Sequence, residues 1–139
     1  MKFKKKIASR VKQFREELEL SQLELANLVG VSRQTIYYLE RGSYNPSLTI
    51  SFKLSEILEK PIDEIFYQEP IIKDILESKS LADLREIAEV AGINLEKLAS
   101  LSEIDDEQLT SSFNDSILVK IAMGLGMEFE DLFEKEAEN

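Results

Sequence analysis

Apolar residues recur every three or four positions through the first half of the chain, which is the period of an amphipathic helix. Val11, Phe14 and Leu18 predict a first helix over roughly residues 8–18. A fifth and last helix of this half should open at Pro61, because proline is favoured in the first helical turn.

Polar residues that favour helix ends divide the segment between these two helices. Ser21 and Glu24 form a capping box for a second helix, and Gly30 can take the left-handed conformation that ends it. Ser32 caps a third helix over residues 33–41. The fourth helix follows the Asn45-Pro46 turn and begins at Ser47.

The second half repeats the pattern of the first half. The two halves align with a shift of 73 residues, which becomes 67 beyond residues 41–46, a segment without a counterpart. Identical residues then meet at Leu25 and Leu98, Ala26 and Ala99, Leu28 and Leu101, Ile50 and Ile117, Lys53 and Lys120, Leu58 and Leu125, and Phe66 and Phe133. Residues 81–133 therefore look like a diverged second copy, the alternative being a chance match between unrelated amphipathic helices.

A further helix over residues 71–78 precedes the copy. It could pack on either half or form a dimer seam. The expected fold is all-α, with one domain over residues 1–68 and a degenerate helical copy over residues 69–139.

Charge separates the halves. The chain carries a net charge of −10, but residues 1–66 hold 11 basic and 9 acidic side chains, and residues 67–139 hold 6 and 18. The total argues against nucleic acid as a partner, whereas the first half taken alone does not.

Composition narrows the chemistry. The sequence has no cysteine and no histidine, which removes disulfides, Cys/His metal sites and every Ser-His or Cys-His mechanism. Carboxylates are plentiful, but neither a glycine-rich phosphate loop nor an EF-hand spacing accompanies them. We expect no catalytic activity, no cofactor and no metal site. Because a membrane span and the apolar stretch of a signal peptide are both missing, we expect a cytoplasmic protein.

The third helix has an unusual outer face. With Ile36 and Leu39 turned inward, a period of 100° per residue places Arg33, Gln34, Tyr37, Tyr38 and Arg41 outward. These side chains hydrogen-bond base edges and phosphates, and none of them is acidic. A short helix, a turn at Gly30 and a second short helix are typical of the helix-turn-helix motif.

The chain resembles the Xre family of Cro- and phage-repressor-like regulators over residues 8–66. The resemblance rests on Ser21-Gln22-x-x-Leu25-Ala26, Gly30-Val31-Ser32-Arg33-Gln34-Thr35-Ile36 and Glu40-Arg41-Gly42-x-Tyr44-Asn45-Pro46-Ser47-Leu48. It implies a five-helix, lambda-repressor-like fold whose third helix enters the major groove of double-stranded DNA.

By position, the resemblance implies base contacts for Arg33, Gln34 and Tyr38. It implies phosphate or sugar contacts for Gln22, Ser32 and Thr35, helped by Tyr44 and Asn45. Arg15 and Glu40 match a family ion pair between the first and third helices. Tyr37 and Tyr38 depart from the smaller polar residues usual at their positions, so the recognised DNA sequence cannot be carried over.

Some assignments have alternatives. Arg33 and Gln34 could be solvated helix residues, and the two tyrosines could pack on a neighbouring helix or a partner subunit. Lys2, Lys4, Lys5 and Lys6 form either a frayed tail or an arm along the DNA backbone.

The outward face has changed in the second copy. Asp106, Glu107, Thr110 and Ser111 stand where Arg33, Gln34, Tyr37 and Tyr38 stand in the first half. Carboxylates repel phosphates, so this copy should contact protein rather than DNA. Both partners of the ion pair become apolar together, as Ala88 and Phe113.

The leading hypothesis is a sequence-specific DNA-binding transcriptional regulator, acting as a repressor and a homodimer on a palindromic operator. The acidic half would dimerise, bind a protein partner or restrain DNA binding. The alternative is an antitoxin or antirepressor that acts only through protein contacts.

Overall fold

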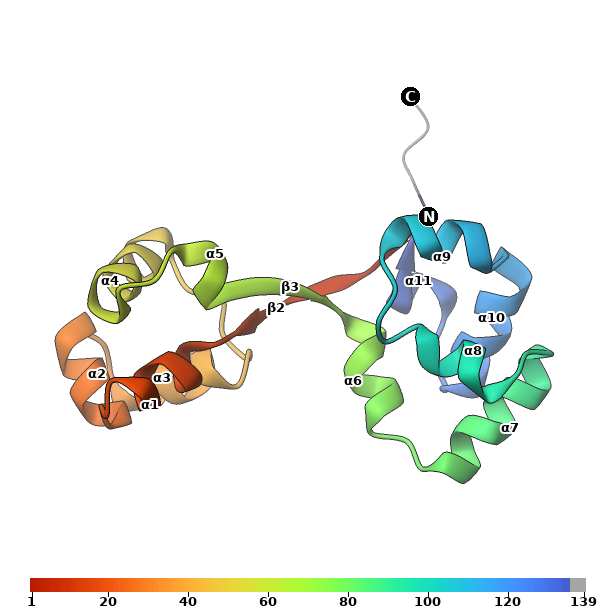
Figure 1. Ribbon diagram of the computed structural model, residues 1–139, viewed down its shortest axis with the longest axis horizontal. Helices are drawn as coiled ribbons and strands as arrows, with labels where there is room; N and C mark the ends of the chain where they lie inside the picture. Colours follow the sequence, from red (N-terminus) through yellow and green to blue (C-terminus); the bar gives the residue numbers. More distant parts are fainter. Residues whose placement is uncertain (136–139) are drawn as a thin grey trace. The chain divides into compact units, whose positions relative to one another are not determined.

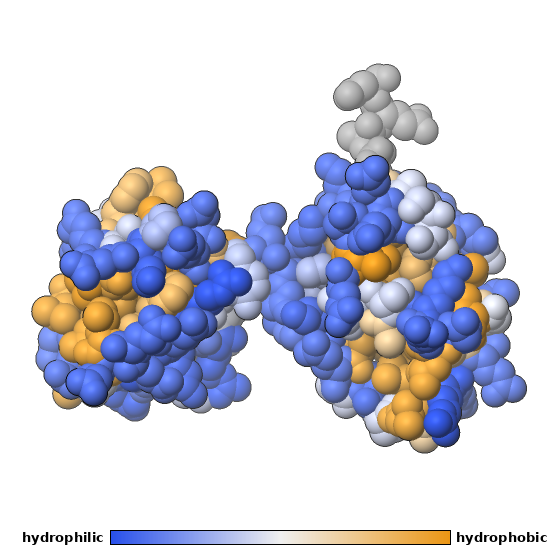
Figure 2. Space-filling model, viewed as in Figure 1, coloured by the Kyte–Doolittle hydropathy of each residue, from blue (hydrophilic) through white to orange (hydrophobic). Residues whose placement is uncertain are grey.

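The computed structural model describes residues 1–135, which form two compact units with separate hydrophobic cores (Figure 1). The N-terminal unit consists of Lys6–Glu69, and the C-terminal unit combines Met1–Lys5 with the chain from Pro70 onward. In the space-filling view, polar residues cover much of the visible surface of each unit, with apolar areas between them (Figure 2). Within residues 1–135, no helix has both the length and the apolar character that a membrane crossing requires.

The N-terminal unit contains the five expected helices. They are α1 (Val11–Glu17), α2 (Gln22–Val29), α3 (Arg33–Glu40), α4 (Leu48–Leu58) and α5 (Ile62–Ile65). Ser21, Ser32 and Ser47 cap three of them, each by accepting a backbone N–H three residues on. The helices enclose a core whose central residues are fully buried, among them Val11, Leu25, Ile36, Leu54 and Ile65.

Two short strands flank this bundle and were not expected. β2 (Lys5–Ser9) pairs with β3 (Phe66–Pro70), so α1 begins at Val11 rather than at residue 8 and α5 ends before Phe66. The N–H of Arg10 continues the pairing, donating to the Ile65 carbonyl at 2.8 Å. The all-α expectation is nonetheless confirmed in its main point, since helices make up most of both units.

The C-terminal unit also contains a run of five short helices. They are α7 (Leu81–Ala91), α8 (Leu95–Ser100), α9 (Asp106–Ser112), α10 (Asp115–Gly124) and α11 (Phe129–Leu132). In chain order, α7 to α11 align with α1 to α5, with ends that differ by a few residues. Ala88 and Phe113, which replace the ion pair, are buried in the core of this unit.

The additional helix α6 (Ile71–Glu77) packs on the C-terminal unit. Ile72 and Leu76 are buried there beside Leu98, Leu118 and Leu132. The structure thus decides among the three expectations for this segment: within the chain, its apolar side belongs to the C-terminal core.

The lysine-rich start of the chain is not a frayed tail in this structure, and its contact with DNA stays a prediction. β1 (Lys2–Phe3) pairs antiparallel with β4 (Phe133–Glu134), so residues 1–5 belong to the C-terminal unit rather than to a domain over residues 1–68. The Phe3 ring is 2% exposed and lies 6.0 Å from the ring of Phe133. Burial of this ring and the strand pairing explain why the segment is held.

β1 occupies in the C-terminal unit a place like that of the strand before α1 in the N-terminal unit. The Lys4 N–H donates to the Leu132 carbonyl at 2.9 Å, and the Arg10 N–H donates to the Ile65 carbonyl at 2.8 Å. Leu132 and Ile65 are aligned positions in the two copies. The segment before α7 is helix α6, and in the C-terminal unit this strand is supplied by Lys2–Phe3 instead.

Candidate nucleic-acid interface

The turn between α2 and α3 is fixed by residues at the two helix ends. In the capping box, Ser21 Oγ accepts the Glu24 N–H at 3.0 Å, and Glu24 Oε1 accepts the Ser21 N–H at 3.1 Å. Gly30 ends α2 with a φ of 85°, which glycine adopts without steric cost. Ser32 Oγ accepts the Thr35 N–H at 3.1 Å and starts α3, so the direction of α3 is set locally.

The outer side of α3 forms a shallow hollow of about 360 Å³. Its lining residues are those that the helical period placed outward: Arg33, Gln34, Tyr37 and Tyr38. They offer a guanidinium, an amide and two phenols to a ligand, all of which hydrogen-bond base edges or phosphates. Ile36 and Leu39 anchor the opposite side of the helix in the core.

Contacts along the helix hold the two tyrosines. Gln34 Nε2 donates to the Tyr38 hydroxyl at 3.2 Å, and the Arg41 guanidinium donates to the Tyr37 hydroxyl. The two rings meet edge to face with centroids 5.6 Å apart. Tyr37 and Tyr38 remain 37% and 41% exposed, so neither ring is buried in the core of the N-terminal unit.

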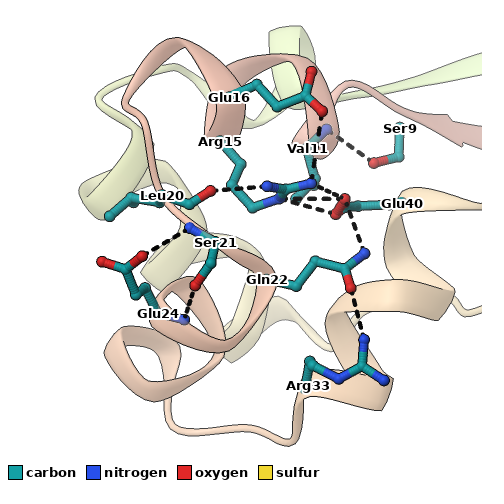
Figure 3. A network of polar contacts seen from close by, with 10 residues as sticks. All are labelled: Ser9, Val11, Arg15, Glu16, Leu20, Ser21, Gln22, Glu24, Arg33 and Glu40. Carbon is teal, nitrogen blue, oxygen red and sulfur yellow. Dashed lines mark hydrogen bonds and ion pairs between the residues drawn. The ribbon is translucent and has the colours of Figure 1, made fainter.

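A chain of polar contacts connects this face to the ion pair behind it (Figure 3). Arg15 Nη2 lies 2.9 Å from Glu40 Oε1, and the Arg15 Nε also donates to Glu40. Gln22 Nε2 donates to the same Glu40 oxygen at 3.4 Å, while Gln22 Oε1 accepts from Arg33 Nη1 at 3.0 Å. The expected ion pair is therefore confirmed, and through Gln22 it orients Arg33.

The ion pair between Arg15 and Glu40 is largely buried. The side chains of Arg15 and Glu40 are only 11% and 4% exposed. The hydrogen bond to Glu40 raises the pKa of Arg15 despite the opposing effect of desolvation. Arg15 Nη1 also donates to the Leu20 carbonyl at 2.8 Å, which ties the end of α1 to this network.

The other expected contact residues surround α3. Ser32 Oγ and Thr35 Oγ1 lie 2.8 Å apart at its N-terminal end. Tyr44 and Asn45 are exposed in the turn between α3 and α4. The structure thus groups the candidate residues around the N-terminal end, the outer side and the C-terminal turn of α3.

The face of α9 that aligns with the outer side of α3 contacts the first five residues of the chain. Asp106, aligned with Arg33, accepts the Phe3 N–H at 2.8 Å and bonds Lys5 Nζ at 2.7 Å. Thr110, aligned with Tyr37, donates to the Met1 carbonyl at 3.2 Å. The acidic character of this face follows from the sequence. Its contact with residues 1–5 could not be predicted, because opposite charge was the one sequence signal for it.

The placement of the lysines also corrects the charge division. Residues 1–5 and 70–139 hold 9 basic and 17 acidic side chains, and residues 6–69 hold 8 and 10. The N-terminal unit is therefore not net basic as a whole. Any attraction to DNA must come from the local charges on α3 rather than from the net charge of the unit.

A sequence model described as helix-turn-helix matches residues 11–65, the helical part of the N-terminal unit. An HTH-type transcriptional regulator of Archaeoglobus fulgidus is 45% identical over 58 residues, which are 42% of this chain and 82% of that protein. A second such regulator, from Methanocaldococcus jannaschii, is 41% identical over 44% of this chain and 92% of its own length. The regulator YgzD of Bacillus subtilis is 34% identical over the same shares.

These matches define the class of the N-terminal unit as a helix-turn-helix domain. The chain belongs to the family of HTH-type transcriptional regulators, of the Xre and Cro-like kind that its motifs resemble. The relatives named above are matched over less than half of the chain, and the helix-turn-helix match ends at residue 65. The role of the C-terminal unit has to be argued from its own residues.

Proposed function

We propose that the chain binds specific double-stranded DNA through the outer side of α3 and represses transcription. The observation that carries the proposal is the hollow lined by Arg33, Gln34, Tyr37 and Tyr38. Arg33 and Gln34 lie in the first turn of α3, from which recognition helices contact base edges in the major groove. The contact from Gln22 supports a prearranged Arg33.

The residues around α3 fit contacts to the DNA backbone. We assign phosphate or sugar contacts to Gln22, Ser32 and Thr35 on one side, and to Tyr44 and Asn45 in the following turn. Arg41, at the end of α3, would add a charge to the same surface. Such contacts set the register of a helix in the groove, while the base contacts set the sequence.

A homodimer on a palindromic operator would follow from two-fold symmetry, with half-sites about 10 bp or a multiple apart. We propose dimerisation as the first role of the C-terminal unit, binding of a protein partner as the second, and the cytoplasm as the place of action. An antitoxin or antirepressor is the alternative function. It would be favoured by a stoichiometric complex with a neighbouring gene product that shows no DNA binding.

The test uses the whole chain, because residues 1–5 belong to the C-terminal unit. Genomic fragments are selected for binding, and affinity for the selected site and for random DNA is measured at several salt concentrations. Arg33→Ala should cost about 1–3 kcal/mol on the selected site, or about 5- to 150-fold, and far less on random DNA. Arg85→Ala, an exposed arginine of α7, is the control with the same charge change. Binding without salt dependence or sequence preference would overturn the proposal.

A further inference from the structure

The C-terminal unit has a hollow between α7 and α10 that is separate from the face covered by β1. It measures about 290 Å³ and is lined by Lys79, Asp83, Glu86, Ile87, Val90 and Gly124. Ile87 and Gly124 form an apolar floor, while Val90 lies at its edge and is 61% exposed. Asp83 and Glu86 place carboxylates beside the apolar surface.

The floor of the hollow differs from the aligned positions of the N-terminal unit. Ile87 and Gly124 align with Phe14 and Ile57, so two large side chains have become smaller in the C-terminal unit. At Gly124 even a single added carbon would lie 3.1 Å from Ile87 Cγ1, which shows how closely α10 approaches α7 at this point. The Ile87 side chain therefore packs directly against Gly124, and the absence of a side chain at Gly124 lets α10 approach α7.

At the edge of the hollow, an apolar residue stands where the N-terminal unit has a charged one. Val90 aligns with Glu17, so an exposed carboxylate of α1 is replaced by an exposed apolar side chain on α7. An isolated exposed valine is ordinary, but this one adjoins a hollow with both apolar and charged lining that could receive another side chain. The position therefore gains apolar contact area where the N-terminal unit has charge.

The charges around the hollow argue against a second copy of this chain as its occupant. Asp83, Glu86 and Val90 recur at helical spacing along one side of α7. Lys79 also lines the hollow, which leaves an excess of one negative charge at its rim. A second copy would bring the same excess of carboxylates to the contact. Because the C-terminal unit holds 17 acidic and 9 basic side chains, a basic partner gains attraction both at the rim and at longer range.

We infer that the hollow between α7 and α10 docks a protein segment that inserts one apolar side chain and carries Lys or Arg beside it. The inserted side chain would contact Ile87, Val90 and Gly124, and the basic residue would pair with Asp83 or Glu86. This deepens the proposed role of the C-terminal unit in protein contacts and is independent of DNA binding through α3.

The test selects peptides from a random-sequence display library against the whole chain. The enriched peptides should share an apolar residue with Lys or Arg within one helical turn of it. Val90→Glu, which restores the residue type of the N-terminal unit, should weaken the binding of these peptides by about tenfold or more. Leu81→Glu makes the same change at another exposed apolar residue of α7 and should leave binding unaltered.

Two outcomes would overturn the inference. One is enrichment of acidic or uncharged peptides, or of peptides whose binding Val90→Glu does not affect. The other is a dimer of the unliganded chain, measured by sedimentation, that dissociates in Val90→Glu and not in Leu81→Glu. Affinity of Val90→Glu for DNA at low salt is measured in parallel, so that failure of this docking site is distinguished from failure of the DNA-binding proposal.

Discussion

Asp106 Oδ2 lies 2.7 Å from Lys5 Nζ, a contact between residues 101 positions apart in the sequence. The other oxygen of the same carboxylate accepts the Phe3 N–H. Asp106 stands at the position that aligns with Arg33 of α3. The acidic residue at this position thus holds the N-terminal segment through Phe3 of β1 and Lys5 of β2.

Asp106→Ala should remove the contacts of this carboxylate with Phe3 and Lys5. We expect it to lower the free energy of unfolding of the C-terminal unit by about 1 kcal/mol. The loss is small because the ion pair is partly exposed, with the two side chains 32% and 28% accessible. Denaturant unfolding measures the loss, with Glu107→Ala, an exposed neighbour on α9, as the control. Equal stability of the two variants would contradict the assigned role of Asp106.

The attachment of β1 should also depend on pH. Burial alone would raise the pKa of Asp106, but the hydrogen bonds from Lys5 and Phe3 and the charges of Lys5 and Lys2 outweigh burial and lower it. A carboxyl with a lowered pKa in the folded state contributes stability above its ordinary value of 3.8 and loses it as the pH falls through the lowered value. The Phe3 amide resonance should follow this titration in NMR spectra, and Asp106→Asn should remove it.

Phe3→Ala should destabilise the C-terminal unit by about 3–5 kcal/mol, because a buried aromatic ring is lost from its core. Hydrogen exchange resolved along the chain separates the two units. Faster exchange is expected in α9 and α11, and unchanged exchange in α2 and α3. Lys2→Ala, an exposed residue of the same strand, should alter neither unit, and faster exchange of α2 in Phe3→Ala would refute this division.

A disulfide can test whether the lysines serve DNA binding. Lys2 and Glu134 are opposite each other in the β1–β4 ladder and the chain has no cysteine, so Lys2→Cys/Glu134→Cys can close one engineered bridge. Oxidised and reduced protein should bind the selected operator with equal affinity and equal salt dependence. If oxidation lowers the slope of log affinity against log salt by about one per lysine, the lysines act as a DNA arm after all.

The ion pair between Arg15 and Glu40 can be tested by a double substitution with the residues that align with it in the C-terminal unit. Glu40→Ala should cost about 3–5 kcal/mol, because it leaves the Arg15 guanidinium buried without its carboxylate. Arg15→Ala/Glu40→Phe, which reproduces Ala88 and Phe113, should recover most of that loss in thermal unfolding. A double variant no more stable than Glu40→Ala would show that the surrounding core does not accept the exchange.

The helices could be predicted because their signals are local. Ser21 with Glu24, Gly30 and Ser32 define a turn within a dozen residues, and the period of Ile36 and Leu39 fixes which side of α3 faces outward. The candidate residues on α3 followed from that period. The contact between Gln22 and Arg33 did not, because it depends on the rotamers of two long side chains.

The strands could not be predicted for the opposite reason. β1 has two residues and one apolar side chain, too short for an alternating pattern, and its partner β4 lies at the far end of the chain. The assignment of Lys2–Lys6 from charge alone therefore chose between a tail and a DNA arm. Pairing with β4 and burial of Phe3 exclude the tail, and neither is visible in the local sequence.

β1 is synthesised well before its partner β4, because Lys2 pairs with Glu134 far along the chain. Lys4 Nζ bonds the carbonyl of Glu130, 126 positions later, and translation of that distance takes on the order of 6 to 25 s. During this interval the N-terminal unit, Lys6–Glu69, can fold on the ribosome, while β1 has no β4 strand to pair with. A chain interrupted before Phe133 would carry a complete α3 but could not pair β1 with β4, so its C-terminal unit would lack this strand contact.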